Sequence, residues 1–177
     1  MVKKLLRLFA YTLFFSLALM AFVPKSSIYY LLEKNLKKFD IVISDEQLEE
    51  SLFSLTIRNA NISTKGIDSA TVGEGDITFL LLYNKLSFHN LKLSSIVETY
   101  LPSKIALLEI DYSLLHPLTV EVNAHGDFGE GRASLHLLDR NASLVLKPSK
   151  KMFSNYRKSL RLFKKNKNGE YIYAKSL

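Results

Sequence analysis

Residues 53–58, Phe-Ser-Leu-Thr-Ile-Arg, alternate strictly between apolar and polar side chains. Successive side chains of a strand point to opposite faces, so this period of two predicts a β-strand with one buried face. Turn candidates follow at residues 59–61 and 65–66 and bound the strand. The stretch therefore predicts a sheet with a core on one face, and it sets the fold class of the chain.

Similar short apolar runs recur downstream, separated by glycine, proline, asparagine and aspartate. Connections this short favour antiparallel pairing, because parallel strands need long crossovers. Residues 94–101 break the series and predict a short helix. We therefore expect a mainly β domain over residues 40–177 with flanking helices. The expected strands are 67–72, 76–82, 85–93, 104–114, 118–124, 132–138, 142–146 and 170–174.

Two helical segments are expected on the N-terminal side of this strand. Residues 45–50 predict one helical turn, capped by Ser44 or Asp45. Residues 25–39 form a second segment, in which Ile28, Leu31, Leu32 and Leu36 recur at helical spacing. We expect this second segment to be a juxtamembrane helix that continues the N-terminal anchor as a stalk.

The chain begins with a basic and apolar segment. Residues 1–24 are expected to be a transmembrane anchor, and Lys3, Lys4 and Arg7 keep its N-terminus in the cytoplasm by the positive-inside rule. A cleaved signal peptide and a buried helix are the alternatives, but Ala18 and Ala21 do not make an A-x-A cleavage site. The domain over 40–177 is then exported. The anchoring side chains are Leu8, Phe9, Leu13, Phe14, Phe15, Leu17, Leu19 and Phe22.

The C-terminal part predicts a basic amphipathic helix. After Pro148, the residues Met152, Phe153, Tyr156, Leu160 and Phe163 recur at helical spacing. We expect this helix to pack on the sheet, since an exposed sheet face needs an apolar cover. Docking on anionic lipid or an acidic partner is the alternative. The basic surface candidates are Lys150, Lys151, Arg157, Lys158, Arg161, Lys164 and Lys165.

Charge is distributed unevenly along the chain, whose formal net charge is +7. Residues 33–140 hold 10 basic and 16 acidic side chains, whereas residues 141–169 hold nine basic side chains and no acidic one. A nucleic-acid-binding protein carries its positive charge on the folded face that meets phosphate. An acidic body with basic ends instead favours a membrane surface or an acidic protein partner, and no nucleic acid.

Motifs for catalysis and metal binding are missing from the sequence. There is no cysteine, and His89, His116, His125 and His136 show no metal-binding spacing. Residues 127–129 spell Asp-Phe-Gly without the other kinase motifs. We therefore predict no enzyme, no metal and no cofactor.

One modification signal is present. Residues 139–143, Asp-Arg-Asn-Ala-Ser, fit the extended bacterial glycosylation sequon at Asn141. An exported turn can accommodate such a glycan, so Asn141 is a candidate for modification.

Three short motifs follow the order of elements in a known family. They are Tyr-Leu-Leu-Glu at 30–33, Leu-Thr-Ile-Arg-Asn-Ala-Asn-Ile at 55–62 and Asn-Gly-Glu-Tyr at 168–171. With the anchor and the repeated strands, the chain is similar to the type II secretion system protein N family and, more loosely, to AsmA-like envelope proteins. The resemblance implies a bacterial inner-membrane anchor, a curved periplasmic β-sheet and a non-catalytic role in secretion or envelope assembly.

Two hypotheses for function result. The first is an accessory protein of an envelope or secretion machine that acts through protein contacts of its β domain. The second is a lipid-binding or lipid-transfer module that uses an apolar sheet face. The two hypotheses differ in whether the apolar face of the sheet is covered. An open apolar groove favours lipid, and a closed sheet favours protein contacts. The lipid-face candidates, which a helix-covered core would instead seal, are Phe79, Leu81, Leu86, Phe88, Leu91 and Leu93.

Overall fold

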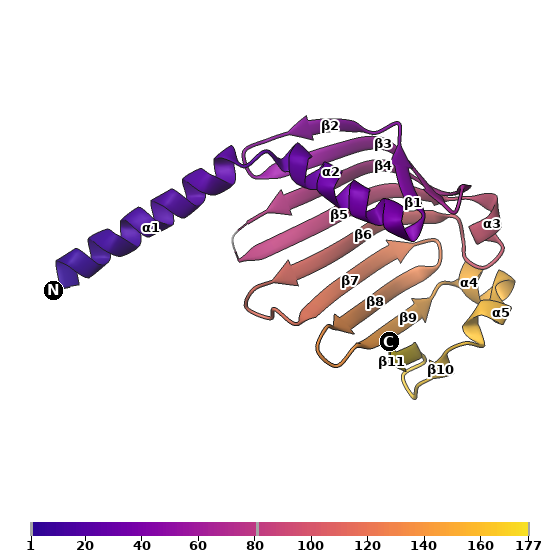
Figure 1. The fold of residues 1–177 in the computed structure, drawn as a ribbon. Helices are drawn as coiled ribbons and strands as arrows, with labels where there is room; N and C mark the ends of the chain where they lie inside the picture. Colours follow the sequence, from indigo (N-terminus) through magenta and orange to yellow (C-terminus); the bar gives the residue numbers. More distant parts are fainter. Residues whose placement is uncertain (1, 81, 177) are drawn as a thin grey trace.

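The computed structural model describes residues 2–80 and 82–176. These residues form one curved, open, antiparallel sheet with short helices against it, and an N-terminal helix projects away from the sheet (Figure 1). The predicted fold class, mainly β with flanking helices, is confirmed. The helices are α1 (Val2–Phe22), α2 (Lys25–Leu36), the 3-10 helix η1 (Lys37–Phe39), α3 (Ser95–Glu98), α4 (Lys150–Asn155) and α5 (Arg157–Leu160).

The described part of the chain contributes eleven strands to the sheet. Their spatial order is β1-β3-β4-β5-β6-β7-β8-β9-β11-β10, and β2 also pairs with β3. From β3 to β9 the order in space follows the order in sequence, as hairpin connections require. The strands are β1 (Ile41–Ser44), β2 (Gln47–Glu50), β3 (Ser54–Thr64), β4 (Ile67–Phe79), β5 (Tyr83–Leu93), β6 (Lys104–Ser113), β7 (Thr119–Gly126), β8 (Gly129–His136), β9 (Asn141–Pro148), β10 (Lys164–Lys165) and β11 (Tyr171–Ser176).

The two faces of the sheet differ in chemistry. On the convex face, Thr56 donates a hydrogen bond to Asp76 on the next strand at 2.7 Å. On the same face, the ammonium of Lys85 lies 2.6 Å from a carboxylate oxygen of Glu109. The concave face carries apolar residues in matching register. The sheet therefore has one wetted face and one face that must be covered.

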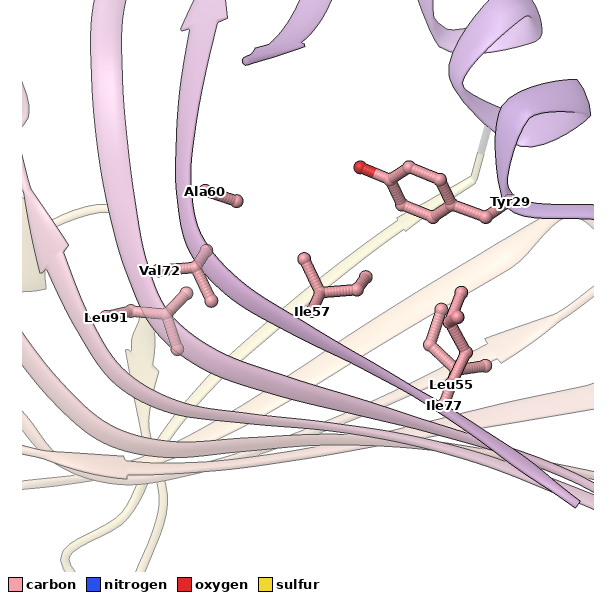
Figure 2. Packing of buried hydrophobic residues seen from close by; sticks show 7 residues of the cluster. All are labelled: Tyr29, Leu55, Ile57, Ala60, Val72, Ile77 and Leu91. Carbon is pink, nitrogen blue, oxygen red and sulfur yellow. The ribbon is translucent and has the colours of Figure 1, made fainter. Parts of the chain in front are cut away.

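Helix α2 covers the concave face at the β1–β4 end. Tyr29 projects from it onto Leu55 and Ile57 of β3, and all three side chains are buried (Figure 2). The helix lies where the sequence predicts it, but it packs on the sheet and is not a stalk. The packed face is also not the predicted stripe, three residues of which remain exposed: Ile28, Leu31 and Leu32. Sequence periodicity located the helix but not the face that it buries.

A carboxylate on β2 fixes the start of α2. The backbone N–H of Lys25 donates to Glu50 at 2.9 Å, and the hydroxyl of Ser26 donates to the same carboxylate at 2.8 Å. These bonds satisfy groups that the first turn of a helix leaves unpaired. They lower the pKa of Glu50 below its usual value, the bond from the Lys25 N–H first.

The C-terminal helices cover the other end of the concave face. Met152 of α4 and Leu160 of α5 are buried against Phe128 and Leu146. One continuous helix was predicted, and the structure instead breaks it at Tyr156, whose φ of −121° is not helical. The Ser159 hydroxyl donates to the carbonyl of Tyr100 at 2.7 Å. This bond holds α5 against the β5–β6 connection.

Two further local predictions are wrong. Residues 45–50 do not form a helical turn, because Gln47–Glu50 pairs with β3 as strand β2. Strands predicted at 67–72 and 76–82 are one strand, β4, which passes through Gly73 and Gly75 without a turn. Gly75 is needed there for space, since a Cβ would lie 2.7 Å from the ring of Phe88 on β5.

Candidate functional site

A strip of the concave face lies between the two helix-covered clusters and belongs to neither. Its residues are apolar and only half-buried, whereas Leu55 beneath α2 is completely buried. The cores under α2 and under α4–α5 share a single partly buried neighbour among the described residues, Ile105. The open strip consists of Ile110, Val120, Val122, Ala133, Leu135 and Leu144.

Strand register aligns these residues into rows that run across the sheet. Ile110 pairs with Val122, Val122 with Ala133, and Ala133 with Leu144. The row crosses four strands, and three spacings of ~4.8 Å give it a length of ~14 Å. Beyond Ile110 it continues through Leu86 towards the cluster under α2. The result is a continuous apolar track at right angles to the strands.

Where the track reaches α4 and α5, it deepens into a groove of about 630 Å³. Small residues on the strands leave the space, because Ala124, Gly131 and Ala133 present little or no side chain. Lys158 and Ser159 supply polar groups among the lining residues. The wall opposite the strands comes from Tyr100, Leu101, Met152, Leu162 and Phe163.

The predicted lipid-face residues lie nearer to α2 than this groove. Phe79, Leu86 and Phe88 are partly buried against the cluster under α2, and Leu91 is buried within it. Leu93 is half-buried at the end of β5, and Leu81 lies outside the described residues. The sealing helix there is α2, whereas the basic C-terminal helix was expected.

Sequence reasoning missed the groove residues Val122, Ala133 and Leu144. Alternation in β7–β9 was visible, but alanine and glycine weakened the apolar signal. Pairing the predicted hairpins in register would have aligned the three residues in one row.

All of the predicted basic residues lie on α4, α5 and β10 or directly beside them, and all are exposed. The Lys151 ammonium lies 2.6 Å from Asp127. Their hydrogen bond lowers the pKa of the Asp127 carboxyl and raises the pKa of Lys151. Arg157 stacks over the Phe153 ring at 5.2 Å from its centroid. The set is gathered at the end of the sheet that α1 does not approach (Figure 1).

The predicted anchor residues line α1, and their side chains are exposed. The segment Lys3–Phe22 has the length and composition of a membrane span, which a signal sequence shares. Asn141 is exposed at the start of β9, where it pairs with His136.

The groove is lined mainly by apolar side chains, with Lys158 and Ser159 as polar groups. Within residues 2–80 and 82–176, no three histidine or acidic side chains come together as a metal ion would require. Comparison with known proteins gives no matching family model, no matching curated protein and no matching solved structure. The site must therefore be interpreted from its own geometry.

Proposed function

We propose that the concave face binds the apolar part of a lipid. The observation that carries the proposal is the uncovered row Ile110–Val122–Ala133–Leu144, which leads into the groove beside α5. Ligand sites are typically concave, mostly apolar and lined by few polar groups. Exposed apolar surface of this extent is costly for a soluble fold, so an occupant that covers it stabilises the protein.

The shape of the concave face favours a lipid, rather than a second sheet, as the group that covers it. A sheet that packs on another sheet needs a broad face of interdigitating side chains. Here α2 and the α4–α5 pair stand on the two ends of the face and leave a channel between them. A narrow, flexible chain fits such a channel.

The proposal includes a bacterial inner-membrane location with α1 as the anchor and the sheet on the periplasmic side. Its support is the apolar length of α1 and the basic residues Lys3, Lys4 and Arg7 that precede the apolar run. An anchored lipid-binding domain stays close to its source of lipid, which raises its effective concentration there.

Photo-crosslinking from adjacent residues on opposite faces tests the proposal. A benzophenone amino acid is placed at Val122 or Ala133 on the concave face, and at Asn123 or Ser134 on the convex face as matched controls. The full chain is irradiated in vesicles of phosphatidylethanolamine and phosphatidylglycerol and analysed by mass spectrometry. We expect lipid adducts at Val122 and Ala133. Equal adducts on both faces, or none at Val122 and Ala133, would contradict lipid binding.

Protein contact at a sheet edge is the second candidate function. Strand β10 pairs only with Tyr171 and Ile172 of β11, so the outer edge of residues 173–176 meets no other described strand. An open edge of this kind can add a strand from a partner. A role as an accessory protein of a secretion or envelope machine would use this edge. Protein adducts from a benzophenone at Ala174, absent from Asn123, would support it.

A further inference from the structure

The connections along one rim of the sheet are unusually apolar. Turns are commonly built from glycine, asparagine, aspartate, proline and serine. Four successive connections on this rim instead carry exposed leucines, of which Leu115 and Leu138 are 75% and 71% exposed. The leucine rim consists of Leu52, Leu80, Leu82, Leu114, Leu115, Leu118, Leu137 and Leu138.

Backbone hydrogen bonds align these connections side by side. The N–H of Phe79 donates to Phe53 at 2.8 Å, which joins the first connection to the second. The N–H of Leu114 donates to Leu82 at 2.9 Å, and the N–H of Leu137 donates to Leu118 at 2.8 Å. The leucines therefore lie along one edge of the sheet, whose strand connections are at the left of Figure 1.

The opposite rim has a different character. Its β3–β4 turn is Lys65-Gly66, and in its β7–β8 turn Asp127 is half-buried and paired with Lys151 while Phe128 is buried. Exposed apolar side chains lie on this rim too, namely Phe39 and Ile67 beside the β3–β4 turn, Ile96 and Tyr100 in the β5–β6 connection and Leu162 after α5. Basic residues of η1, α4 and α5 stand among them, so this rim is mixed and charged, whereas leucine dominates the other.

Helix α1 leaves the molecule from the leucine rim. The Lys25 ammonium donates to the carbonyl of Ala21 at 3.0 Å, and its backbone N–H donates to Glu50 at the end of β2. The Lys25 side chain is only 2% exposed. These contacts fasten the junction between α1 and α2 to the β2–β3 connection, where the row of leucines begins. A bilayer that contains α1 therefore lies on this side of the sheet.

We propose that the leucine rim is a membrane-contact surface, inserted into the interface of the bilayer that α1 spans. Apolar side chains at an interface bury ~5–10 Å into the boundary of headgroups and acyl chains. Asp139 and Arg140, in the last connection, remain at headgroup level. The rim holds the strand ends against the bilayer and turns the open side of the concave channel towards its lipids. The inference rests on the proposed anchoring by α1 and holds whether or not the groove binds lipid.

The natural absence of cysteine permits a direct depth measurement. Single-cysteine variants of the full chain are spin-labelled and reconstituted in phosphatidylethanolamine and phosphatidylglycerol vesicles. The positions are Leu115→Cys and Leu138→Cys on the rim, Phe14→Cys in α1 and Ile96→Cys on the opposite rim. Ile96 is a matched apolar control, being 57% exposed. Collision rates with oxygen and with a water-soluble nickel chelate report the depth of each label.

We expect the ratio of oxygen to nickel collision rates to be several-fold higher for labels at Leu115→Cys and Leu138→Cys than for the label at Ile96→Cys. The ratio should be highest at Phe14→Cys. If Phe14→Cys is embedded but the rim labels match Ile96→Cys, the membrane contact is overturned and the anchor stands. If Phe14→Cys is itself exposed to the nickel chelate, both fail.

Asn141 provides a second test because it lies at the same rim. A bulky hydrophilic glycan there would hold the leucines away from the bilayer. We therefore expect the native peptide that contains Asn141 to have its unmodified mass. A glycan on that peptide at high occupancy would overturn the membrane contact.

Discussion

The two ends of the sheet are built from the same kind of strand but close their apolar face differently. At the β3–β4 end, large side chains meet Tyr29 of α2, and Leu55, Ile57 and Ile77 are buried. At the β6–β9 end, alanine and glycine alternate with larger residues, and the helices cover only the strand ends. Helix α2 lies across the strands and closes a core beneath it, whereas α4 and α5 lie at the rim and leave the middle of the sheet face open.

The largest difference is expected in the cost of removing a leucine from either end. Leu55→Ala should lower the free energy of unfolding by about 2–5 kcal/mol, because it leaves a cavity under α2. Leu144→Ala should cost less than about 1 kcal/mol, because its half-buried side chain lies on an open face, where water or lipid can fill the space that the shorter side chain leaves. Urea unfolding of the full chain in nanodiscs, followed by circular dichroism, measures both. Equal losses would contradict the assignment of the β6–β9 strip as uncovered.

Close packing between β4 and β5 gives the next effect. Gly75→Ala places a methyl group 2.7 Å from a ring carbon of Phe88, so the ring must shift. Overpacking of this kind should cost about 1–3 kcal/mol. The double variant Gly75→Ala with Phe88→Leu should recover part of that loss in thermal unfolding. If the single variant is as stable as the native protein, the approach of Phe88 to Gly75 is not as tight as described.

A smaller effect concerns pH and the start of α2. The hydrogen bonds from Lys25 and Ser26 hold the pKa of Glu50 below its usual value of about 4.3. A group with a lowered pKa in the folded state contributes stability above its unfolded pKa, and loses it as pH falls through the folded pKa. Glu50→Gln should therefore lower the melting temperature at pH 7 and have little effect at pH 2–3, a range chosen from that usual value. A difference that is constant across this range would contradict the role of the ionised carboxylate.

The smallest effect is expected at Tyr29. Its hydroxyl is buried without a hydrogen bond of ordinary geometry among the described residues, although the Glu46 carboxylate lies near it. Burial first, and then the nearby carboxylates of Glu46 and Glu33, raise the pKa of Tyr29 well above its usual value. Tyr29→Phe should leave the free energy of unfolding within about 1 kcal/mol of the native value, or raise it slightly. A larger loss, measured by urea unfolding, would reveal a bond that the hydroxyl makes in solution.

The sequence predicted the sheet because alternation is a local property. Residues 53–58 and their repeats follow a period of two wherever one face is buried, and most of the strands lie where that period places them. Helix α2 was predicted as an element but not as part of the core, because its place depends on the distant carboxylate of Glu50. No local pattern encodes a contact of that kind.

Errors at the strand ends have a physical origin in the leucine rim. Strands predicted at 76–82 and 132–138 end at Phe79 and His136, since Leu80, Leu137 and Leu138 resemble strand residues but lie in connections. Strand ends are predicted from the polar residues of the turns that follow, so a turn made of leucines is mistaken for more strand. The same departure from ordinary turn composition is the observation behind the proposed membrane contact of the rim.

Blocking the channel tests the central claim, that lipid occupies the open face, most directly. Ala133→Trp places a large ring beside Val122 and fills the track, whereas Ser134→Trp places the same ring on the convex face. With the benzophenone at Val122, we predict that Ala133→Trp abolishes the lipid adduct and that Ser134→Trp preserves it, with both variants folded by circular dichroism. A lipid adduct of undiminished yield in folded Ala133→Trp would contradict lipid binding on this face.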